Sequence, residues 1–257
     1  EGVSSYTGLS DKEAFNIEYW SLEEDKLKRL PKPKSLSGKI ALITGGSGAI
    51  GKASAEKILE NGGNVFLTDI SQKNLNKTIQ ELENKYGSDN IKGCQMDVTN
   101  EQNVLEGFKT LLNTFGGLDI LVSSVAVNTE ATFENTSLEI WNQNFSVLST
   151  GYFLVARESF KIMKNQQMGG SILFIVSKNG MIPSKKVSSY CAAKAAELQL
   201  SRCIALEGAE YNIRSNAINP DAVIKDSNMW SEELRNKRSK TYNISVSYTH
   251  LTLPTKA

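Results

Sequence analysis

Short apolar runs alternate with longer stretches that carry apolar residues three and four positions apart, from Lys39 to Asn219. Such short runs are typical of parallel strands buried on both faces, and the longer stretches are typical of amphipathic helices. The expected strands are IALIT, NVFLTD, IKGCQMDV, LDILVSS, SILFIVS and IRSNAIN, and helices are expected to begin near Ala49, Ser71, Glu101, Leu138 and Tyr190. The alternation predicts an α/β fold, a Rossmann-like doubly wound parallel sheet with helices on both faces.

The first expected strand runs directly into the glycine-rich stretch TGGSGAIG, in which Gly46, Gly48 and Gly51 satisfy G-x-G-x-x-G. Such glycines let the backbone turn tightly and approach a pyrophosphate at a helix N-terminus. Asp69 ends the second strand 18 residues after Gly51, where an acid accepts hydrogen bonds from an adenosine ribose. Its carboxylate would repel a 2′-phosphate, and the loop contains no arginine or lysine, so we expect NAD and not NADP. Asp97, after the third strand, either lines the adenine pocket or caps the helix that follows.

Tyr190 and Lys194 lie four residues apart at the start of an expected helix, and Ser177 lies 13 residues before Tyr190 at the end of a strand. A free tyrosine has a pKa of about 10 and is a poor base at neutral pH. A lysine one helical turn away favours the phenolate and is expected to lower that pKa. We therefore predict a catalytic centre in which Tyr190 is the general base and Ser177 binds the substrate oxygen. The alternative is an unremarkable pair on a helix surface.

Together these residues resemble the short-chain dehydrogenase/reductase family, from about Gly38 to Asn243. TGGSGAIG, Asp69, MDV, the spacing from Ser177 to YCAAK, and INP at Ile218 occur in the family's order. The resemblance implies a catalytic Ser177, Tyr190 and Lys194, an alcohol or aldehyde substrate, and a homo-oligomer in the complete protein. The residues that it and the glycine loop assign to NAD are Gly45, Ser47, Gly48, Ala49, Ile50, Gly51, Asp69, Asp97, Val98, Ser124, Tyr190, Lys194 and Pro220.

The sequence also departs from the family pattern. SSVA at 123–126 stands where N-N-A-G is usual, and Pro220 is followed by Asp221 where glycine is usual. Leu148 takes the place of the helix asparagine that often completes the catalytic tetrad. The resemblance therefore does not imply the usual relay of protons through a water molecule that this asparagine places. Ala49 replaces the middle glycine of the loop, which also fits the spacing of the family's longer epimerases and dehydratases.

Three stretches resemble the dehydrogenase part of bifunctional rhamnulose-1-phosphate aldolase/lactaldehyde dehydrogenase proteins: EAFNIEYWSLEEDKLKR, GYFLVARESF and NPDAVIKDSNMW. The resemblance implies that residues 1–36 are a linker or appendage from an upstream aldolase-type domain and that residues 37–244 are the dehydrogenase domain. Residues 245–257 are expected to be a non-native tail, and the sheet is expected to lack the family's last strand, which would weaken NAD binding and activity. A surface appendage and a genuine C-terminal extension are the alternatives for the two ends.

Bulk composition excludes several classes of protein. The 29 basic and 28 acidic residues nearly cancel, so no basic field indicates a nucleic-acid or membrane partner. The longest apolar runs are strand-sized, far below the roughly 18–20 residues of a membrane span. Cys94, Cys191 and Cys203 are expected to be reduced core thiols, and the only histidine is His250, so no metal is expected. These features favour a cytoplasmic protein.

The leading hypothesis is an NAD-dependent dehydrogenase that oxidises lactaldehyde to lactate in deoxysugar (rhamnose) catabolism. A polyol or sugar dehydrogenase of the same family is the second. The third is a non-catalytic NAD-binding module, which Leu148 favours and the intact Ser177, Tyr190 and Lys194 oppose.

Overall fold

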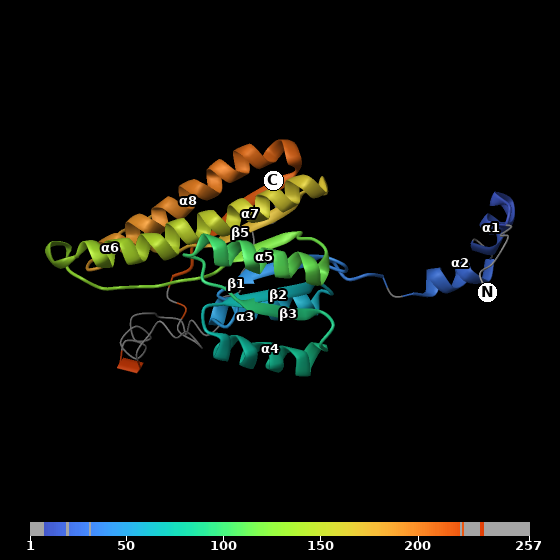
Figure 1. Cartoon of the computed structure of the whole chain (residues 1–257), viewed down its shortest axis with the longest axis horizontal. Helices are drawn as coiled ribbons and strands as arrows, with labels where there is room; N and C mark the ends of the chain where they lie inside the picture. The colour runs from blue at the N-terminus through green and yellow to red at the C-terminus, as the bar shows by residue number, and fades with distance from the viewer. Residues whose placement is uncertain (1–7, 19–20, 31, 222, 224–231, 234–257) are drawn as a thin grey trace. The chain divides into compact units, whose positions relative to one another are not determined.

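A computed structural model (Figure 1) describes residues 8–18, 21–30, 32–221, 223 and 232–233. The chain divides into two units, residues 1–35 and 36–257. The described residues of the first unit form two helices, α1 (Asp11–Glu18) and α2 (Ser21–Arg29). The expected tail, residues 245–257, lies outside the described residues, and the domain assignment stays a prediction.

Helix α1 was not predicted, and its start is explained by a capping box. Ser10 Oγ accepts a hydrogen bond from the Glu13 N–H at 3.3 Å, and a Glu13 carboxylate oxygen accepts one from the Ser10 N–H at 3.1 Å. These bonds satisfy backbone donors that the first helical turn leaves without partners. The apolar side chains of Phe15 and Ile17 are exposed, so this helix lacks a core of its own.

The second unit is built on a six-stranded sheet in the order β3-β2-β1-β4-β5-β6, and every neighbouring pair is parallel. Five of the six strands lie within the runs predicted from the sequence, and β5 begins one residue before its predicted run, at Gly170. Their bounds are β1 Ile40–Thr44, β2 Asn64–Asp69, β3 Ile91–Gln95, β4 Ile120–Ser123, β5 Gly170–Ile175 and β6 Ile213–Ile218. The prediction of a doubly wound parallel sheet is confirmed.

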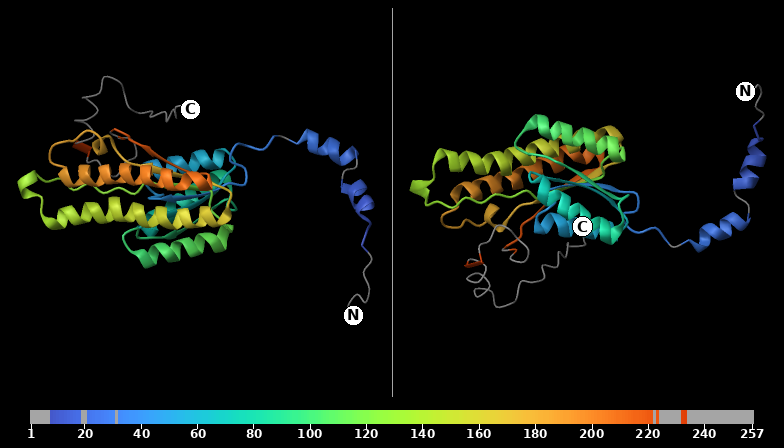
Figure 2. Two further views of the ribbon diagram at one scale, coloured as in Figure 1. Left: turned by 90° about the horizontal axis from the view of Figure 1, so that it is seen from above. Right: turned by 60° about the horizontal axis from the view of Figure 1, so that its bottom comes forward.

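Helices cover both faces of this sheet (Figures 1 and 2). Alternating strand residues divide the core: Leu42 packs with α5 and α7 on one face, whereas Ala41 and Ile43 pack with α3 and α4 on the other. Leu198 and Ile204 add α8 to the first face. The helices are α3 Ala49–Glu60, α4 Gln72–Tyr86, α5 Glu101–Phe115, α6 Leu138–Asn144, α7 Gly151–Gln166 and α8 Ser188–Gly208. Each predicted helix begins within two residues of its expected position.

The strand order reverses between β1 and β4, which creates the switch point where doubly wound sheets bind ligands beyond the carboxyl ends of their strands. Thr44 and Ser123 end these two strands side by side, with their hydroxyl oxygens 3.3 Å apart. The fold therefore predicts a ligand site beyond the carboxyl ends of β1 and β4.

Between α6 and α7 the chain forms a π-helical segment, Phe145–Thr150, which the sequence analysis did not predict. Leu148, in this segment, is fully buried. Wide helical turns of this kind occur frequently at functional sites. This one lies against α8, the helix that carries Tyr190 and Lys194.

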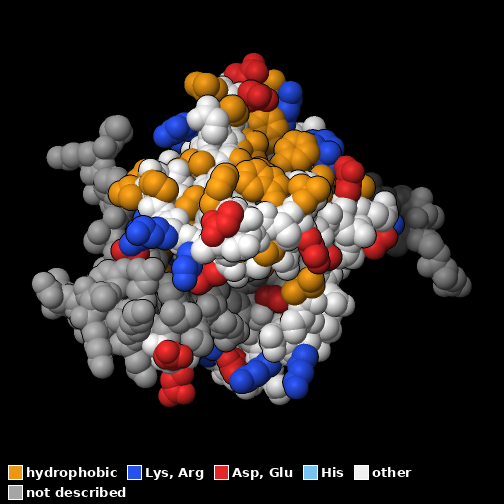
Figure 3. Space-filling model, turned by 90° about the vertical axis from the view of Figure 1, so that its left-hand side faces the viewer, with side chains coloured by type: hydrophobic (Ala, Val, Ile, Leu, Met, Phe, Trp, Pro, Cys, Tyr) orange, Lys and Arg blue, Asp and Glu red, His pale blue; other side chains and the backbone are white. Residues whose placement is uncertain are grey.

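An apolar surface lies at the end of the molecule that includes α6 (Figure 3). Phe133 is 80% exposed, and Leu138 and Trp141 are also exposed. Exposed apolar patches often mark contacts between proteins, but the predicted homo-oligomer stays a prediction. Among the described residues, no helix is both long enough and apolar enough to cross a membrane.

Candidate active site

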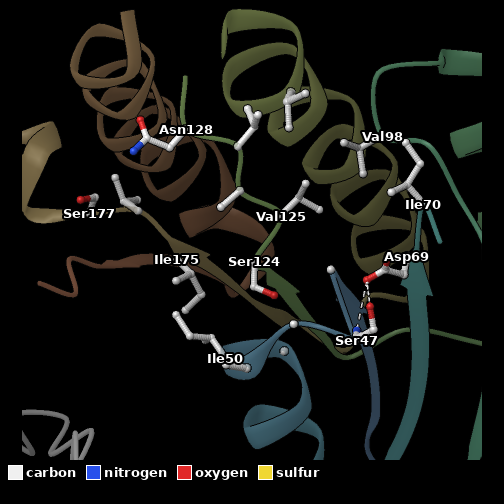
Figure 4. Close-up of a pocket in the computed structure, with 18 of the residues that line it drawn as sticks. Ser47, Ile50, Asp69, Ile70, Val98, Ser124, Val125, Asn128, Ile175 and Ser177 are labelled. Carbon is white, nitrogen blue, oxygen red and sulfur yellow. Dashed lines mark hydrogen bonds between the residues drawn. The ribbon is translucent and has the colours of Figure 1, made fainter. Parts of the chain in front are cut away.

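A cavity of about 740 Å³ lies along the carboxyl edge of the sheet (Figure 4). Ser47 and Asp69 lie at one side of it, whereas Ser177 and Asn128 lie at the other. Of the residues assigned to NAD, those that line it are Gly45, Ser47, Gly48, Ala49, Ile50, Gly51, Asp69, Asp97, Val98, Ser124, Tyr190 and Pro220. Its volume is that of a typical cofactor or small-molecule site.

The glycine loop leaves space that a side chain would fill. Gly45 has φ +64°, and a Cβ there would lie 3.1 Å from the Ser124 carbonyl oxygen. A Cβ on Gly51 would overlap the carbonyl oxygen of Gly45 and lie 3.0 Å from the Cα of Gly46. Because α3 begins within this loop, at Ala49, its first N–H groups offer hydrogen bonds to an anion. The loop therefore fits the pyrophosphate of a dinucleotide.

The Asp69 carboxylate is fixed at the wall of the cavity. Its Oδ2 accepts hydrogen bonds from the Ser47 N–H at 3.2 Å and from the Ser47 hydroxyl, and its Oδ1 accepts one from the Ser71 N–H at 3.0 Å. The glycine loop and the end of β2 thus hold the carboxylate where the sequence analysis expects a ribose. Contact with the ribose stays a prediction.

Asp97 lines the same cavity, and its alternative role as a helix cap is wrong. Asn100 caps α5, since its side chain accepts a hydrogen bond from the Asn103 N–H at 3.0 Å. The Asp97 carboxylate instead accepts hydrogen bonds from the N–H and the hydroxyl of Thr99. Its role toward an adenine remains a prediction.

Ser177 and Tyr190 are brought together at the other side of the cavity. β5 ends at Ile175, so Ser177 lies two residues beyond it, where its hydroxyl oxygen accepts a hydrogen bond from the Asn179 N–H at 3.1 Å. Burial raises the pKa of Tyr190 to about 12, and a hydrogen bond with Ser177 opposes this rise. The Ser177 hydroxyl therefore favours the phenolate form of Tyr190. Its predicted hydrogen bond to a substrate oxygen stays a prediction.

The expected effect of Lys194 on Tyr190 is wrong, because the lysine is engaged elsewhere. Its Nζ lies 3.0 Å from each carboxylate oxygen of Glu197 and 3.1 Å from the carbonyl oxygen of Ile175. The charge of Glu197 opposes that of the lysine and raises the pKa of Tyr190. Lys194 is also fully buried and is not among the residues that line the cavity, so its assignment to NAD stays a prediction.

Leu148 packs against Tyr190, Val187 and Ala193 in a small buried cluster. One helical turn earlier, Asn144 is also fully buried, and its side chain donates hydrogen bonds to the Ile140 carbonyl and, at 3.1 Å, to the Ser189 hydroxyl. An asparagine is thus close to the catalytic helix, but it binds Ser189 and does not line the cavity. Neither Leu148 nor Asn144 therefore places an amide in the cavity for the usual water relay.

Sequence reasoning missed several polar side chains in the lining of the cavity, among them Asn128, Gln143, Ser146 and Asn179. They come from a loop, from α6, from the π-helical segment and from η3 (Lys178–Gly180), where no motif marks them. It also missed Glu197, although a carboxylate three residues after Lys194 on one helix was a usable signal. The prediction of buried thiols is wrong for Cys203, which is exposed on the solvent side of α8.

Comparisons with known proteins agree with this geometry. Residues 39–238 match the family model of short chain dehydrogenases, and residues 1–27 match that of the second domain of class II aldolases. An uncharacterized oxidoreductase of Bacillus subtilis, YuxG, is 41% identical over 242 residues. That alignment covers 94% of this chain but only 35% of YuxG, so the chain spans about a third of that relative.

Two solved structures have the same fold. Sorbitol-6-phosphate 2-dehydrogenase SrlD from Erwinia amylovora is 30% identical, with a TM-score of 0.73 over 80% of this chain and 79% of its own. NAD⁺-bound xylitol dehydrogenase is 28% identical, with a TM-score of 0.70 over 73% of this chain and 72% of its own.

Proposed function

The chain belongs to the short-chain dehydrogenase family, oxidoreductases that use a nicotinamide cofactor, and from this premise we propose that it is an NAD-dependent dehydrogenase that oxidises lactaldehyde to lactate. One observation carries the proposal. A single cavity is lined by the glycine loop and Asp69 at one side and by Ser177 and Tyr190 at the other. A dinucleotide lying along it would bring its nicotinamide to the phenol.

Selection of NAD over NADP rests on Asp69. Its carboxylate is held by Ser47 and Ser71 at the cavity wall. A negative charge there favours the two ribose hydroxyl groups of NAD and repels the 2′-phosphate of NADP. The similarity to a xylitol dehydrogenase solved with NAD⁺ supports the same choice.

The hydrated form of lactaldehyde is a geminal diol, which suits this centre. When bound, NAD supplies the hydride acceptor. Tyr190 takes the proton of one hydroxyl group, Ser177 donates a hydrogen bond to the substrate oxygen, and the C–H bond breaks as a carboxylic acid forms. The acid then ionises to lactate. Acid–base help of this kind is typically worth about 10²–10⁴-fold in rate.

The residues that precede the dehydrogenase domain favour lactaldehyde as the substrate. Residues 1–27 match a class II aldolase model, and YuxG is nearly three times as long as this chain. An upstream aldolase that cleaves rhamnulose 1-phosphate would release lactaldehyde for this centre to oxidise. The hydroxyl group on carbon 2 of lactaldehyde can form hydrogen bonds with polar side chains of the cavity lining, namely Asn128, Gln143 and Asn179.

A polyol or sugar dehydrogenase is the second candidate. The polar lining of the cavity suits several hydroxyl groups as well as one, and two neighbours of known structure are a sorbitol-6-phosphate and a xylitol dehydrogenase. Both candidates share the cofactor and the catalytic residues, so the substrate alone separates them.

The test measures NADH formation with lactaldehyde, xylitol, sorbitol 6-phosphate and glycerol, and identifies lactate by chromatography. Lactaldehyde is expected to give the highest kcat/KM. Tyr190→Phe should lower turnover at least 100-fold and leave NADH affinity within about twofold, since the phenol hydroxyl acts on the substrate. Tyr86→Phe, on the outer helix α4, is the matched control. A higher kcat/KM for a polyol favours the second candidate, and NADH binding without turnover of any substrate favours a non-catalytic module.

A further inference from the structure

Lys194 and Glu197 form a fully buried ion pair directly behind Tyr190. Both residues are 0% exposed. The two carboxylate oxygens of Glu197 and the carbonyl oxygen of Ile175 offer three acceptors within 3.1 Å of Nζ, which matches the three N–H groups of an ammonium. The lysine is therefore held in one position by its own helix and by the end of β5.

Stability alone does not explain why this ion pair is buried. Removing two charges from water costs several kcal/mol per ion, and buried pairs often contribute no more than apolar residues of the same size. In this chain, the neighbouring position on the π-helical segment is Leu148, which is fully buried against Tyr190 and has no polar atom to offer. The polar side chain that contacts the lysine is instead Glu197, on the same helix.

We propose that Glu197 is a positioning residue for the Tyr190–Lys194 pair: it holds the ammonium in place and sets the pH range in which the pair works. The proposal rests on the dehydrogenase function proposed above. Glu197 touches neither the substrate nor the cavity, and acts through Lys194.

The charges around Glu197 determine in which direction the pKa values of Tyr190 and Lys194 move when its charge is removed. The titratable side chains closest to it are Lys194, Tyr190 and Cys191 of α8 and Tyr152 of α7, whose ring lies 5.0 Å from Nζ. β5 contributes the Ile175 carbonyl, Lys178 of η3 is paired with Asp221, and Arg214 of β6 is exposed. Glu197 is thus the negative charge among these groups. It raises the pKa of Tyr190 and that of Lys194, which burial lowers.

Glu197→Gln keeps the size and an acceptor oxygen but removes the charge. Both limbs of the pH profile of kcat/KM should then move to lower pH by about one unit, because Tyr190 and Lys194 each lose a neighbouring negative charge. The difference should grow as the pH rises through about 8, the value to which burial raises the pKa of Glu197. Glu207→Gln, on the exposed side of the same helix, is the matched control and should not shift the profile.

A second readout does not depend on turnover. Tyrosinate formation is followed by ultraviolet difference absorbance in the protein without added nucleotide, and the titration of the Tyr190→Phe protein is subtracted. Tyr190 should titrate about one unit lower in Glu197→Gln than in the wild type. This measurement separates the two proposals, since it reports on Glu197 even if no substrate is turned over.

Glu197→Asp keeps the charge and should keep the wild-type profile, with at most a loss of kcat from poorer positioning. An unshifted titration in Glu197→Gln would overturn the proposal, as would a loss of stability and activity with both limbs in place. An equal shift in Glu197→Asp would overturn it too, because the charge would then not be the cause.

Discussion

Replacing Gly51 by alanine tests whether the backbone of the glycine loop creates the binding site. A Cβ at this position would overlap the carbonyl oxygen of Gly45 and lie 3.0 Å from both the carbonyl carbon of Gly45 and the Cα of Gly46. All three are backbone atoms, so no side chain can rotate away to relieve the overlap. The loop must move, and the N-terminus of α3 must move with it.

The size of the effect follows from the cost of inserting a methyl group into closely packed surroundings, about 1–3 kcal/mol. If the loop is displaced from the pyrophosphate by that amount, NADH binds about 5- to 150-fold more weakly, since each 1.4 kcal/mol is tenfold in affinity. Gly87→Ala, at the C-terminal end of α4 and outside the lining of the cavity, is the control. A Cβ there meets nothing within 4 Å, and its φ of +87° makes alanine costly for stability but not for binding.

Fluorescence titration with NADH measures the affinity of both variants, and urea unfolding without nucleotide measures their stability. We expect Gly87→Ala to bind NADH within about threefold of the wild type and Gly51→Ala to lose affinity. Wild-type affinity in Gly51→Ala, or an equal loss of affinity in Gly87→Ala, would refute the role of the loop backbone. A large fall in the free energy of unfolding of Gly51→Ala would instead locate the damage in the packing of α3.

Two further predictions concern charge. Asp69→Ala should raise the preference for NADP over NAD about tenfold, about 1.4 kcal/mol, because it removes a carboxylate that, in the proposed binding mode, would repel the 2′-phosphate. Comparing kcat/KM for the two cofactors checks this, and an unchanged ratio would contradict the assignment. Lys194→Met leaves Glu197 buried without its partner, so the variant should be about 3–5 kcal/mol less stable than the wild type above pH 8. Burial already raises the pKa of Glu197 to about 8, and removing the lysine raises it further, so the carboxyl stays neutral in acid and the deficit should shrink as the pH falls. Urea unfolding at pH 6 and pH 9 measures this, and a deficit that is equal at both would show that the charge of Glu197 is not its cause.

Local sequence signals predicted most of the fold because they act over a few residues. A strand that is apolar on both faces, such as IALIT, fits only the interior of a parallel sheet, and β1 lies there with buried residues on both sides. The glycine loop and the pair of Tyr190 and Lys194 were found in the same way, because their chemistry depends on short, fixed spacings. The π-helical turn at Phe145–Thr150 was not, since nothing in those residues distinguishes it from a continuous α-helix.

Glu197 shows why the electrostatics of the site could not be predicted from spacing alone. From the sequence, Lys194 has two titratable neighbours on its helix, Tyr190 four residues before it and Glu197 three residues after it. An ammonium one turn away lowers a phenol's pKa, and a carboxylate at a similar spacing does the opposite, so spacing alone leaves the sign open. In the structure, α8 packs against the π-helical segment and β5 so closely that Glu197 loses all contact with water, and its carboxylate opposes the charge of the lysine. The same motif therefore gives a Tyr190 pKa above the ordinary value and not below it. The sign depends on burial, which the packing of distant segments determines, so a catalytic motif identifies the acting residues but not the pH at which they act.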